Sequence, residues 1–426
     1  MFTIYLNFDN KNVLLYTKDT NDTFVSKLKD KEAMNRLSGK KVLFAAGVAG
    51  VILLKAISWK SKEFSNWYVT YIFPVWLNTY ARLTSLVPFS VGEIMLVLAV
   101  LITLFGIGLF VFNLLRKNKY KNGIKRFGTV YAWLVLAVSC IMTLNCSILY
   151  HASSFSEKYM APDETRKYKD ALLVDASENA VARAHAGGYS KKEIALLRDF
   201  IVERCNTLAQ EIARDDSGVP YYDGDLVKAS ADAMRMLGED YGQLSGFYVT
   251  PKYLACSEFF SQQYIMGYYF PFSLEANINS VMYITNVAPT VCHELAHTKG
   301  FINEDDANMI GFLACINSDD PFLQYCGYLS VLSYVNNDFY ESIHKDKETY
   351  QSHIRISDVV AGDNIFLTKE NWTEVEKKAV VKTETVKKVS NTFTETTLKM
   401  NGVEEGMQQY NKVVELLLNY YDGELY

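Results

Sequence analysis

Three long apolar segments in the first third of this 426-residue chain constrain its fold most strongly. They cover residues 42–59, 91–115 and 127–150, and the third carries no charged side chain. A helix rises about 1.5 Å per residue, so each segment is long enough to cross a hydrocarbon layer about 30 Å thick. Soluble domains seldom bury uncharged segments of this length. The sequence therefore predicts three transmembrane helices.

Basic residues flank these segments unevenly. Six lysines and arginines lie in residues 27–41 and six in residues 116–126, whereas the loop between the first two spans carries only Lys60, Lys62 and Arg82. Because basic loops tend to stay in the cytoplasm, we expect a cytoplasmic N-terminus and an extracytoplasmic segment after residue 150. The first apolar segment starts too late for a cleaved signal peptide. We therefore expect a multi-pass protein of the cell membrane.

The chain divides into three parts on this basis: a cytoplasmic segment at 1–40, a membrane domain at 41–150 and an outer domain at 151–426. Residues 1–40 suggest a short hairpin followed by a helix. The outer domain has the pattern of an α+β fold, mainly helical, with two or three strands between residues 246 and 284. Its helices are expected at about 190–213, 225–241, 289–300, 304–316, from 321 onward, 369–400 and 406–421.

Charge and cysteine usage exclude several classes of function. The net charge of −5 argues against binding to nucleic acid, and no glycine-rich phosphate loop is present. Five of the seven cysteines are scattered over the outer domain without a C-x-x-C pair. A cysteine-bound zinc ribbon and a full disulfide framework are therefore not expected, and small buried thiols are the better interpretation.

Residues 293–304 read HELAHTKGFINE, the most specific motif in the chain. Four residues advance a helix by about 400°, so His293 and His297 project within about 40° of each other and can bind one metal ion. Glu294 is rotated by about 100° and can take a proton from metal-bound water. This pattern is typical of zinc metallopeptidases, although two surface histidines on an amphipathic helix would give the same spacing.

A catalytic zinc ion needs a third protein ligand and one open position. Gly300 can end the helix in a left-handed turn and send the chain back past the metal. Glu304 then stands at the start of the next helix, and we expect it to be the third ligand of a single Zn²⁺ ion. Asn303, Asp305 and Asp306 are alternatives at similar distances along the chain.

Four stretches of the sequence resemble a family of uncharacterised bacterial multi-pass membrane proteins assigned to the HExxH zinc metallopeptidase group. They are FPFSLEANIN at 270–279, CHELAHTKGFINEDDAN at 292–308, QYCGYL at 324–329 and MNGVEEGMQQYNKVVELLLNYY at 400–421. With the three spans, the resemblance covers about residues 41–426. It implies a zincin-like metallopeptidase fold for the outer domain. The family's E-x-x-A-N motif matches Glu304 to Asn308, which supports Glu304 as the ligand.

Better-known relatives differ from this pattern. The H-E-x-x-H-x-x-G spacing is similar to that of the metzincins, but Asn303 stands where they carry a third histidine. The metzincin ligand set therefore does not transfer to this chain. In the gluzincins, the glutamate ligand usually lies further along the chain than Glu304 does here.

Further residues are candidates for supporting roles. Asn308 or Asp305 could orient a histidine ligand, or form part of a polar surface. Tyr325 and Tyr328 could donate a hydroxyl to a developing oxyanion, but aromatic packing of their helix is the better interpretation.

The segment before the motif offers two interpretations. Residues 275–279, with Glu275 and Asn277, could form an edge strand that pairs with an extended peptide substrate, or a turn that braces the motif helix. Cys292 precedes a histidine ligand but points about 100° away, so we expect it to pack in the core.

Together these features predict a membrane-anchored zinc metallopeptidase that cleaves a peptide or protein substrate, with Glu294 as general base. The alternative is a catalytically silent, metal-stabilised binding or sensor protein at the membrane surface. Glu294 argues against this alternative, because a structural metal site needs no base. A transporter is disfavoured, since the spans offer no polar pathway. The sequence specifies neither the cleavage site nor the oligomeric state.

Overall fold

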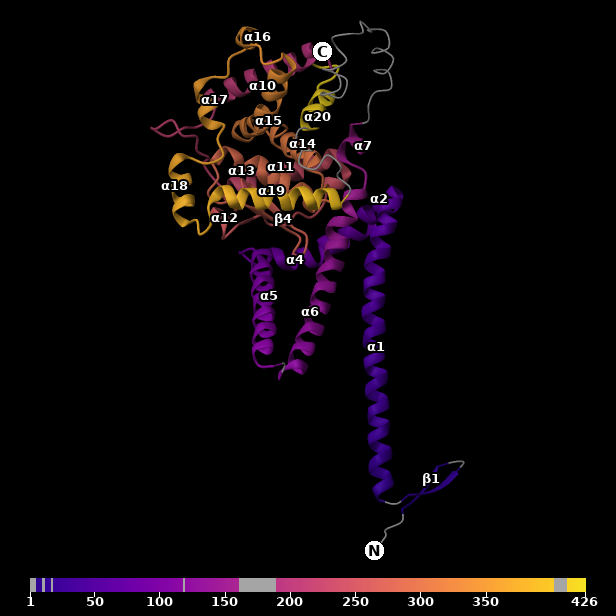
Figure 1. Ribbon diagram of the computed structural model, residues 1–426. Helices are drawn as coiled ribbons and strands as arrows, with labels where there is room; N and C mark the ends of the chain where they lie inside the picture. The colour runs from indigo at the N-terminus through magenta and orange to yellow at the C-terminus, as the bar shows by residue number, and fades with distance from the viewer. Residues whose placement is uncertain (1–4, 10–11, 17, 118, 161–188, 402–411) are drawn as a thin grey trace.

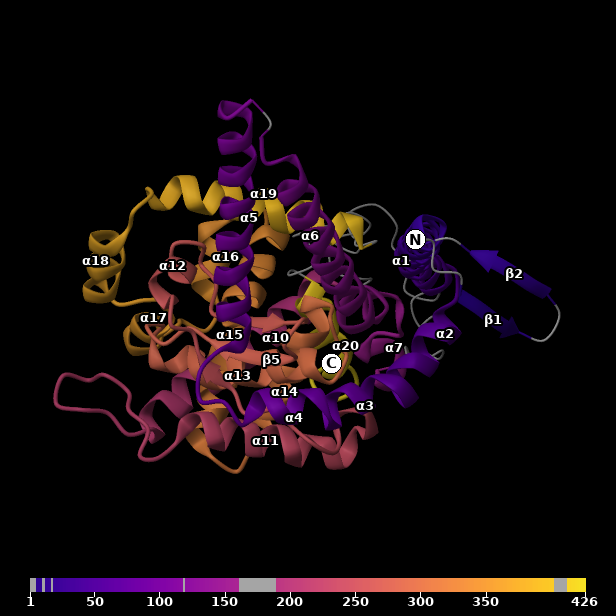
Figure 2. The same ribbon diagram turned by 90° about the horizontal axis from the view of Figure 1, so that it is seen from below.

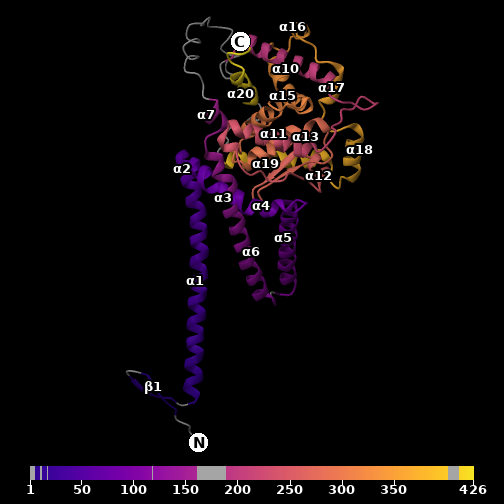
Figure 3. The same ribbon diagram turned by 180° about the vertical axis from the view of Figure 1, so that it is seen from behind.

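A computed structural model describes residues 5–9, 12–16, 18–117, 119–160, 189–401 and 412–426, with side chains from residue 39 onward (Figure 1). A mainly helical outer domain sits above three long apolar helices, and the N-terminus lies at the far end of the first of them (Figures 1 and 3). The predicted architecture of three apolar helices followed by a helical domain with a small sheet is confirmed.

Three helices are long and apolar enough to cross a membrane: Gly39–Lys60, Val91–Leu115 and Lys121–His151. The first is the second half of α1 (Lys18–Lys60), and the second is α5 (Val91–Leu115). The third consists of α6 (Lys121–Met142), a π-helical turn η2 (Thr143–Ser147) and a 3₁₀ turn η3 (Leu149–His151). All three overlap the segments predicted from hydropathy.

The N-terminal segment forms the predicted hairpin and helix. Strands β1 (Tyr5–Asp9) and β2 (Asn12–Tyr16) pair antiparallel with Leu6 opposite Leu15. The helix that follows is not separate, because it continues without a break into the first span as α1. Figure 1 shows the hairpin at the end of α1 that is remote from the outer domain.

The connection between the first two spans is a chain of short helices that underlies the outer domain (Figures 1 and 2). It contains α2 (Lys62–Trp67), η1 (Tyr68–Ile72), α3 (Phe73–Asn78) and α4 (Tyr80–Ser85). Tyr68, Phe73 and Leu77 are buried here, and they belong to the same hydrophobic core as the outer domain. These short helices and the outer domain therefore share one core.

The outer domain contains the motif helix α13 together with further helices. Its helices are α7 (Phe155–Tyr159), α10 (Lys191–Glu211), α11 (Leu226–Asp240), η4 (Gly242–Leu244), α12 (Ser257–Ser261), η5 (Ile284–Asn286), α13 (Val287–Thr298), α14 (Glu304–Ile316), α15 (Pro321–Ser342), α16 (Lys347–Ser352), α17 (Asp358–Asp363), α18 (Lys369–Lys378), α19 (Thr383–Met400) and α20 (Val413–Tyr420). The motif helix packs against α11, α14 and α15.

Two of the predicted helices begin directly after a residue whose side chain caps them. Ser190 caps α10 in a capping box with Glu193, and Asp320 caps α15 just before its first proline. The motif helix starts at Val287, two residues earlier than predicted. The helical segment expected at 369–400 is divided into α18 and α19. Of the helix expected at 406–421, residues 406–411 lie outside the described part of the chain.

A three-stranded sheet lies between α13 and the membrane side of the domain (Figure 1). Its strands are β3 (Lys252–Tyr253), β4 (Gly267–Phe270) and β5 (Glu275–Ile278), in the order β3–β5–β4. β5 is parallel to β3 and antiparallel to β4. The prediction of an edge strand at 275–279 is therefore wrong, because β5 is the central strand and β4 is an edge.

Candidate metal centre

The two histidines are positioned by α13, which ends as the motif predicted. The helix stops at Thr298, and Gly300 follows with a φ of +93°, a left-handed conformation that favours glycine. The amide of Phe301 donates to the carbonyl of Ala296, which turns the chain back over the end of the helix. Three residues later α14 begins at Glu304 and packs against α13.

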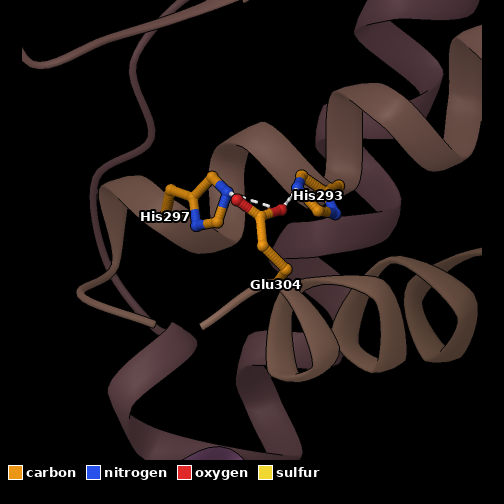
Figure 4. A group of neighbouring side chains, drawn as sticks. All are labelled: His293, His297 and Glu304. Carbon is orange, nitrogen blue, oxygen red and sulfur yellow. Dashed lines mark ion pairs between the residues drawn. The ribbon is translucent and has the colours of Figure 1, made fainter. Parts of the chain in front are cut away.

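The side chains of His293, His297 and Glu304 converge on one point (Figure 4). His293 Nε2 lies 3.1 Å from Glu304 Oε2, and His297 Nε2 lies 3.8 Å from the same oxygen. One ligand atom from each residue falls within 4.8 Å of the other two, so the group could hold a metal ion. The acidic alternatives Asp305 and Asp306 are not part of this group.

Each histidine is oriented by a hydrogen bond at its other ring nitrogen. His293 Nδ1 lies 2.9 Å from Asn308 Oδ1, and His297 Nδ1 lies 2.7 Å from the carbonyl oxygen of Phe301. Both partners are acceptors, so both Nδ1 atoms donate, and in the neutral imidazole Nε2 is then the nitrogen that can bind a metal ion. Asn308, one helical turn after Glu304, thus occupies the orienting position considered from the sequence.

The two histidines differ in how their surroundings affect the charge of the imidazole. Burial and the neighbouring His293 lower the pKa of His297 to about 4, so its imidazole is neutral near pH 7. Burial also acts to lower the pKa of His293, but the hydrogen bond and negative charge of Glu304 outweigh it and raise that pKa. Two nitrogens and one carboxylate oxygen form a ligand set that zinc commonly takes in catalytic sites.

Glu294 lies beside this group in a buried position. Its side chain is 4% exposed, and Oε2 has no hydrogen-bond partner among the described residues. Burial raises the pKa of its carboxyl to about 8, with a smaller contribution from the charge of Glu304. A buried, unpaired carboxyl of raised pKa is suited to exchange protons with a water molecule at the metal position.

Strand β4 approaches Glu294 closely because its first residue is glycine. A Cβ atom at Gly267 would lie 2.5 Å from Glu294 Oε1 and 2.8 Å from Thr290 Cγ2. The edge strand of the sheet therefore passes directly alongside the base candidate.

The structure separates the two tyrosine candidates from the metal group. Tyr325 is buried and donates its hydroxyl to Asp363 Oδ2 at 2.7 Å. Tyr328 packs edge-on against Phe200 and Phe312. The contacts of both side chains therefore agree with a role in packing their helix.

Glu275 and Asn277 also serve the fold. The carboxylate of Glu275 accepts hydrogen bonds from the amides of Val91 (3.2 Å) and Gly92 (2.7 Å) and forms an ion pair with Lys252. It therefore caps the first turn of α5. Asn277 is fully buried in the central strand.

The remaining residues near the motif have varied surroundings. Burial raises the pKa of Asp305 to about 6 and that of Asp306 to about 7. Cys292 is buried and donates to the carbonyl of Ser230, so it packs in the core as expected. Cys205, Cys315 and Cys326 are likewise buried free thiols, whereas Cys256 is exposed.

Two further tyrosines, Tyr268 and Tyr334, feel the charges of the metal group, and the sequence patterns did not indicate either of them. Burial raises the pKa of Tyr268 to about 12, and the negative charges of Glu294 and Glu304 act in the same direction. The pKa of Tyr334 on α15 is also raised, by burial and by Glu304. Tyr268 belongs to β4, and its strand pattern gave no sign of proximity to α13.

Comparison with protein families matches residues 68–418 to a family described as "Protein of unknown function (DUF3810)". The matched segment contains α5, α6, the sheet and every residue of the metal group. No curated protein and no solved structure matches the chain.

Proposed function

The chain belongs to the DUF3810 family, and we propose that it is a membrane-anchored, zinc-dependent peptidase of the HExxH group. The observation that supports this most directly is the convergence of His293, His297 and Glu304 beside the buried carboxyl of Glu294. A site that only stabilised the fold would need no unpaired carboxyl next to its ligands.

In this proposal, His293, His297 and Glu304 hold one zinc ion through two imidazole nitrogens and a carboxylate oxygen. Zinc in such a site lowers the pKa of its bound water toward about 7 and polarises the carbonyl of the scissile bond. Asn308 and the Phe301 carbonyl keep both imidazoles in the tautomer that presents Nε2. Glu294 accepts the proton released by the attacking water and passes it to the leaving amine.

The edge position of β4 supports a peptide as substrate. An extended peptide can pair with a free strand edge through its backbone, which places a scissile bond without demanding a particular sequence. Gly267 brings this edge into contact with Glu294. The uneven distribution of basic residues supports an extracytoplasmic position for the outer domain.

Metal content and peptide cleavage of the full chain in detergent test the proposal. We expect one zinc ion per wild-type chain and little in His293→Ala or Glu304→Ala. Glu294→Gln should retain the ion but cleave a peptide library about 10²–10⁴-fold more slowly, the usual contribution of a general base. His344→Ala is the matched control, since His344 is exposed and outside the metal group.

Two results would contradict the proposal. A wild-type chain without stoichiometric metal would contradict the assignment of His293, His297 and Glu304 as ligands. Cleavage by Glu294→Gln at the wild-type rate would contradict the role of Glu294 as general base. Stoichiometric metal with no cleavage by the wild type would instead favour the metal-stabilised binding or sensor protein.

A further inference from the structure

Helix α19 has an apolar stripe that the outer domain does not cover. Of the residues from Thr383 to Met400, only Thr383 and Leu398 are buried. Val389, Phe393 and Met400 are large apolar side chains with 64%, 68% and 75% of their surface exposed. At about 100° per residue these three lie within about 40° of one another on the helix.

The other two sides of α19 differ in character: one faces the domain and the other is charged. The buried residues Thr383 and Leu398 lie about 130° from the stripe, on the side that faces the domain. Lys388, Glu395 and Lys399 lie about 120° from the stripe on the remaining side, where Lys399 pairs with Glu395. The helix thus has a domain side, a charged side and an exposed apolar side.

Contacts on the domain side hold α19 in this orientation. Gln262 donates its side-chain amide to the carbonyl of Val381 (2.9 Å) and to the hydroxyl of Thr383 (3.0 Å). The ammonium of Lys387 lies 3.8 Å from the ring centre of Tyr264. With the N-terminal half of α19 fixed in this way, the apolar stripe cannot rotate into the core.

The position of α19 suggests what covers the stripe. It runs across the direction of α5 in two perpendicular views and lies in the part of the outer domain nearest the spans (Figures 1 and 2). A helix that runs across a transmembrane span lies roughly parallel to the bilayer plane. Leu83, Leu86 and Phe89, just before α5, add further exposed apolar side chains where the chain enters the second span.

We propose that α19 is an in-plane membrane-surface helix whose stripe, Val389, Phe393 and Met400, inserts into the bilayer that α1, α5 and α6 cross. Amphipathic helices of this type bury an apolar side at the boundary between headgroups and acyl chains and keep their charges in water. The occupant is the lipid itself, which the three spans already place next to the outer domain. This inference does not depend on the peptidase proposal.

Site-directed spin labelling of the full chain in vesicles tests the inference. The background replaces Cys140, Cys146 and Cys256 by serine, because the other cysteines are buried. Single cysteines then replace Val389 or Phe393 on the stripe, and Lys388 or Lys399 on the charged side as matched controls. Each label is probed for collisions with lipid-soluble oxygen and with a water-soluble nickel chelate.

We expect the ratio of oxygen to nickel collisions to be several-fold higher for the stripe labels than for the control labels. Equal ratios on the two sides would overturn the inference. Low collision rates with both reagents at the stripe, at high lipid-to-protein ratio, would also overturn it, because they would indicate a second copy of the chain as the occupant.

Discussion

At the scale of single residues, the contact between Gly267 and Glu294 is the tightest constraint on the proposed base. Glu294 is buried, so it has little room to move away from a new atom on β4. The Glu294 side chain can therefore keep its position only because residue 267, which lies 27 positions earlier in the sequence, is glycine.

Replacing Gly267 by alanine should displace Glu294 without removing a metal ligand. We expect cleavage to fall at least about tenfold, metal content to remain stoichiometric, and stability to drop by about 1–3 kcal/mol from overpacking. Activity, metal analysis and thermal unfolding measure these three effects. Gly242→Ala is the control, because a Cβ atom there meets nothing within 4 Å. Equal losses in both variants would count against a specific role for Gly267.

Glu294 should also make the stability of the metal-free protein depend on pH. Its pKa in the folded state, about 8, is above the ordinary value of 4.5, so the folded state holds this proton more tightly than the unfolded state. Its contribution to stability is complete below pH 4.5 and is lost as pH rises through 8.

We therefore expect wild type to lose stability relative to Glu294→Gln between pH 5 and pH 8, at about 1.4 kcal/mol per unit of pKa difference. The unfolding temperatures of both proteins are measured at each pH with excess chelator. Subtracting the temperature of Glu294→Gln from that of wild type cancels the contributions of Asp305 and Asp306. Curves that stay parallel over this range would show that Glu294 is not a buried carboxyl of raised pKa.

At the scale of elements, the first turn of α5 is attached to the sheet by two carboxylates. Glu275 on β5 accepts from the amides of Val91 and Gly92, while Glu93 on α5 accepts from the amides of Ala255 (2.8 Å) and Cys256 (2.9 Å). The second apolar helix is therefore joined by hydrogen bonds to the central strand β5 and to the segment after β3.

Neutralising Glu275 should weaken this attachment strongly. Its partner Lys252 is 4% exposed, so Glu275→Gln leaves a buried ammonium group without its countercharge. We expect a loss of about 3–5 kcal/mol, measured as a lower unfolding temperature in detergent. Glu341→Gln is the matched control, because the Glu341–Lys345 pair is exposed and should be worth less than about 1 kcal/mol. A similar effect of both variants would contradict the structural role of Glu275.

These elements also show what the sequence could predict. The spans, α10, α14 and the histidine helix follow from local patterns of hydropathy, capping and spacing, so they were found. The role of Glu275 depends on partners 183 and 184 positions away, and the approach of Gly267 depends on sheet order. Neither leaves a local signal, so the sequence alone does not distinguish a central strand at 275–279 from an edge strand.

At the scale of the whole molecule, the short helices between the first two spans complete the core of the outer domain. Tyr68, Phe73 and Leu77 are at most 5% exposed. Burying each such side chain contributes about 1.5–3 kcal/mol, and the net stability of a domain is only about 5–15 kcal/mol.

We expect residues 151–426 alone to lack cooperative unfolding, because they lack these side chains. A chain that begins at residue 61 keeps them and should unfold cooperatively in detergent. Circular dichroism during heating distinguishes the two chains. A cooperative transition for residues 151–426 would show that the short helices are dispensable.

The hydrogen bonds between α5 and the sheet carry a consequence for the lipid environment. A span that is longer than the hydrocarbon layer around it can accommodate the difference by tilting. Since the amides that begin α5 are bound by Glu275, a change of tilt pulls on β5 and, through it, on the strand next to Glu294. Through Glu275 and Glu93, the acyl-chain length of the surrounding lipids thus becomes a variable that can act on the strand beside the metal group.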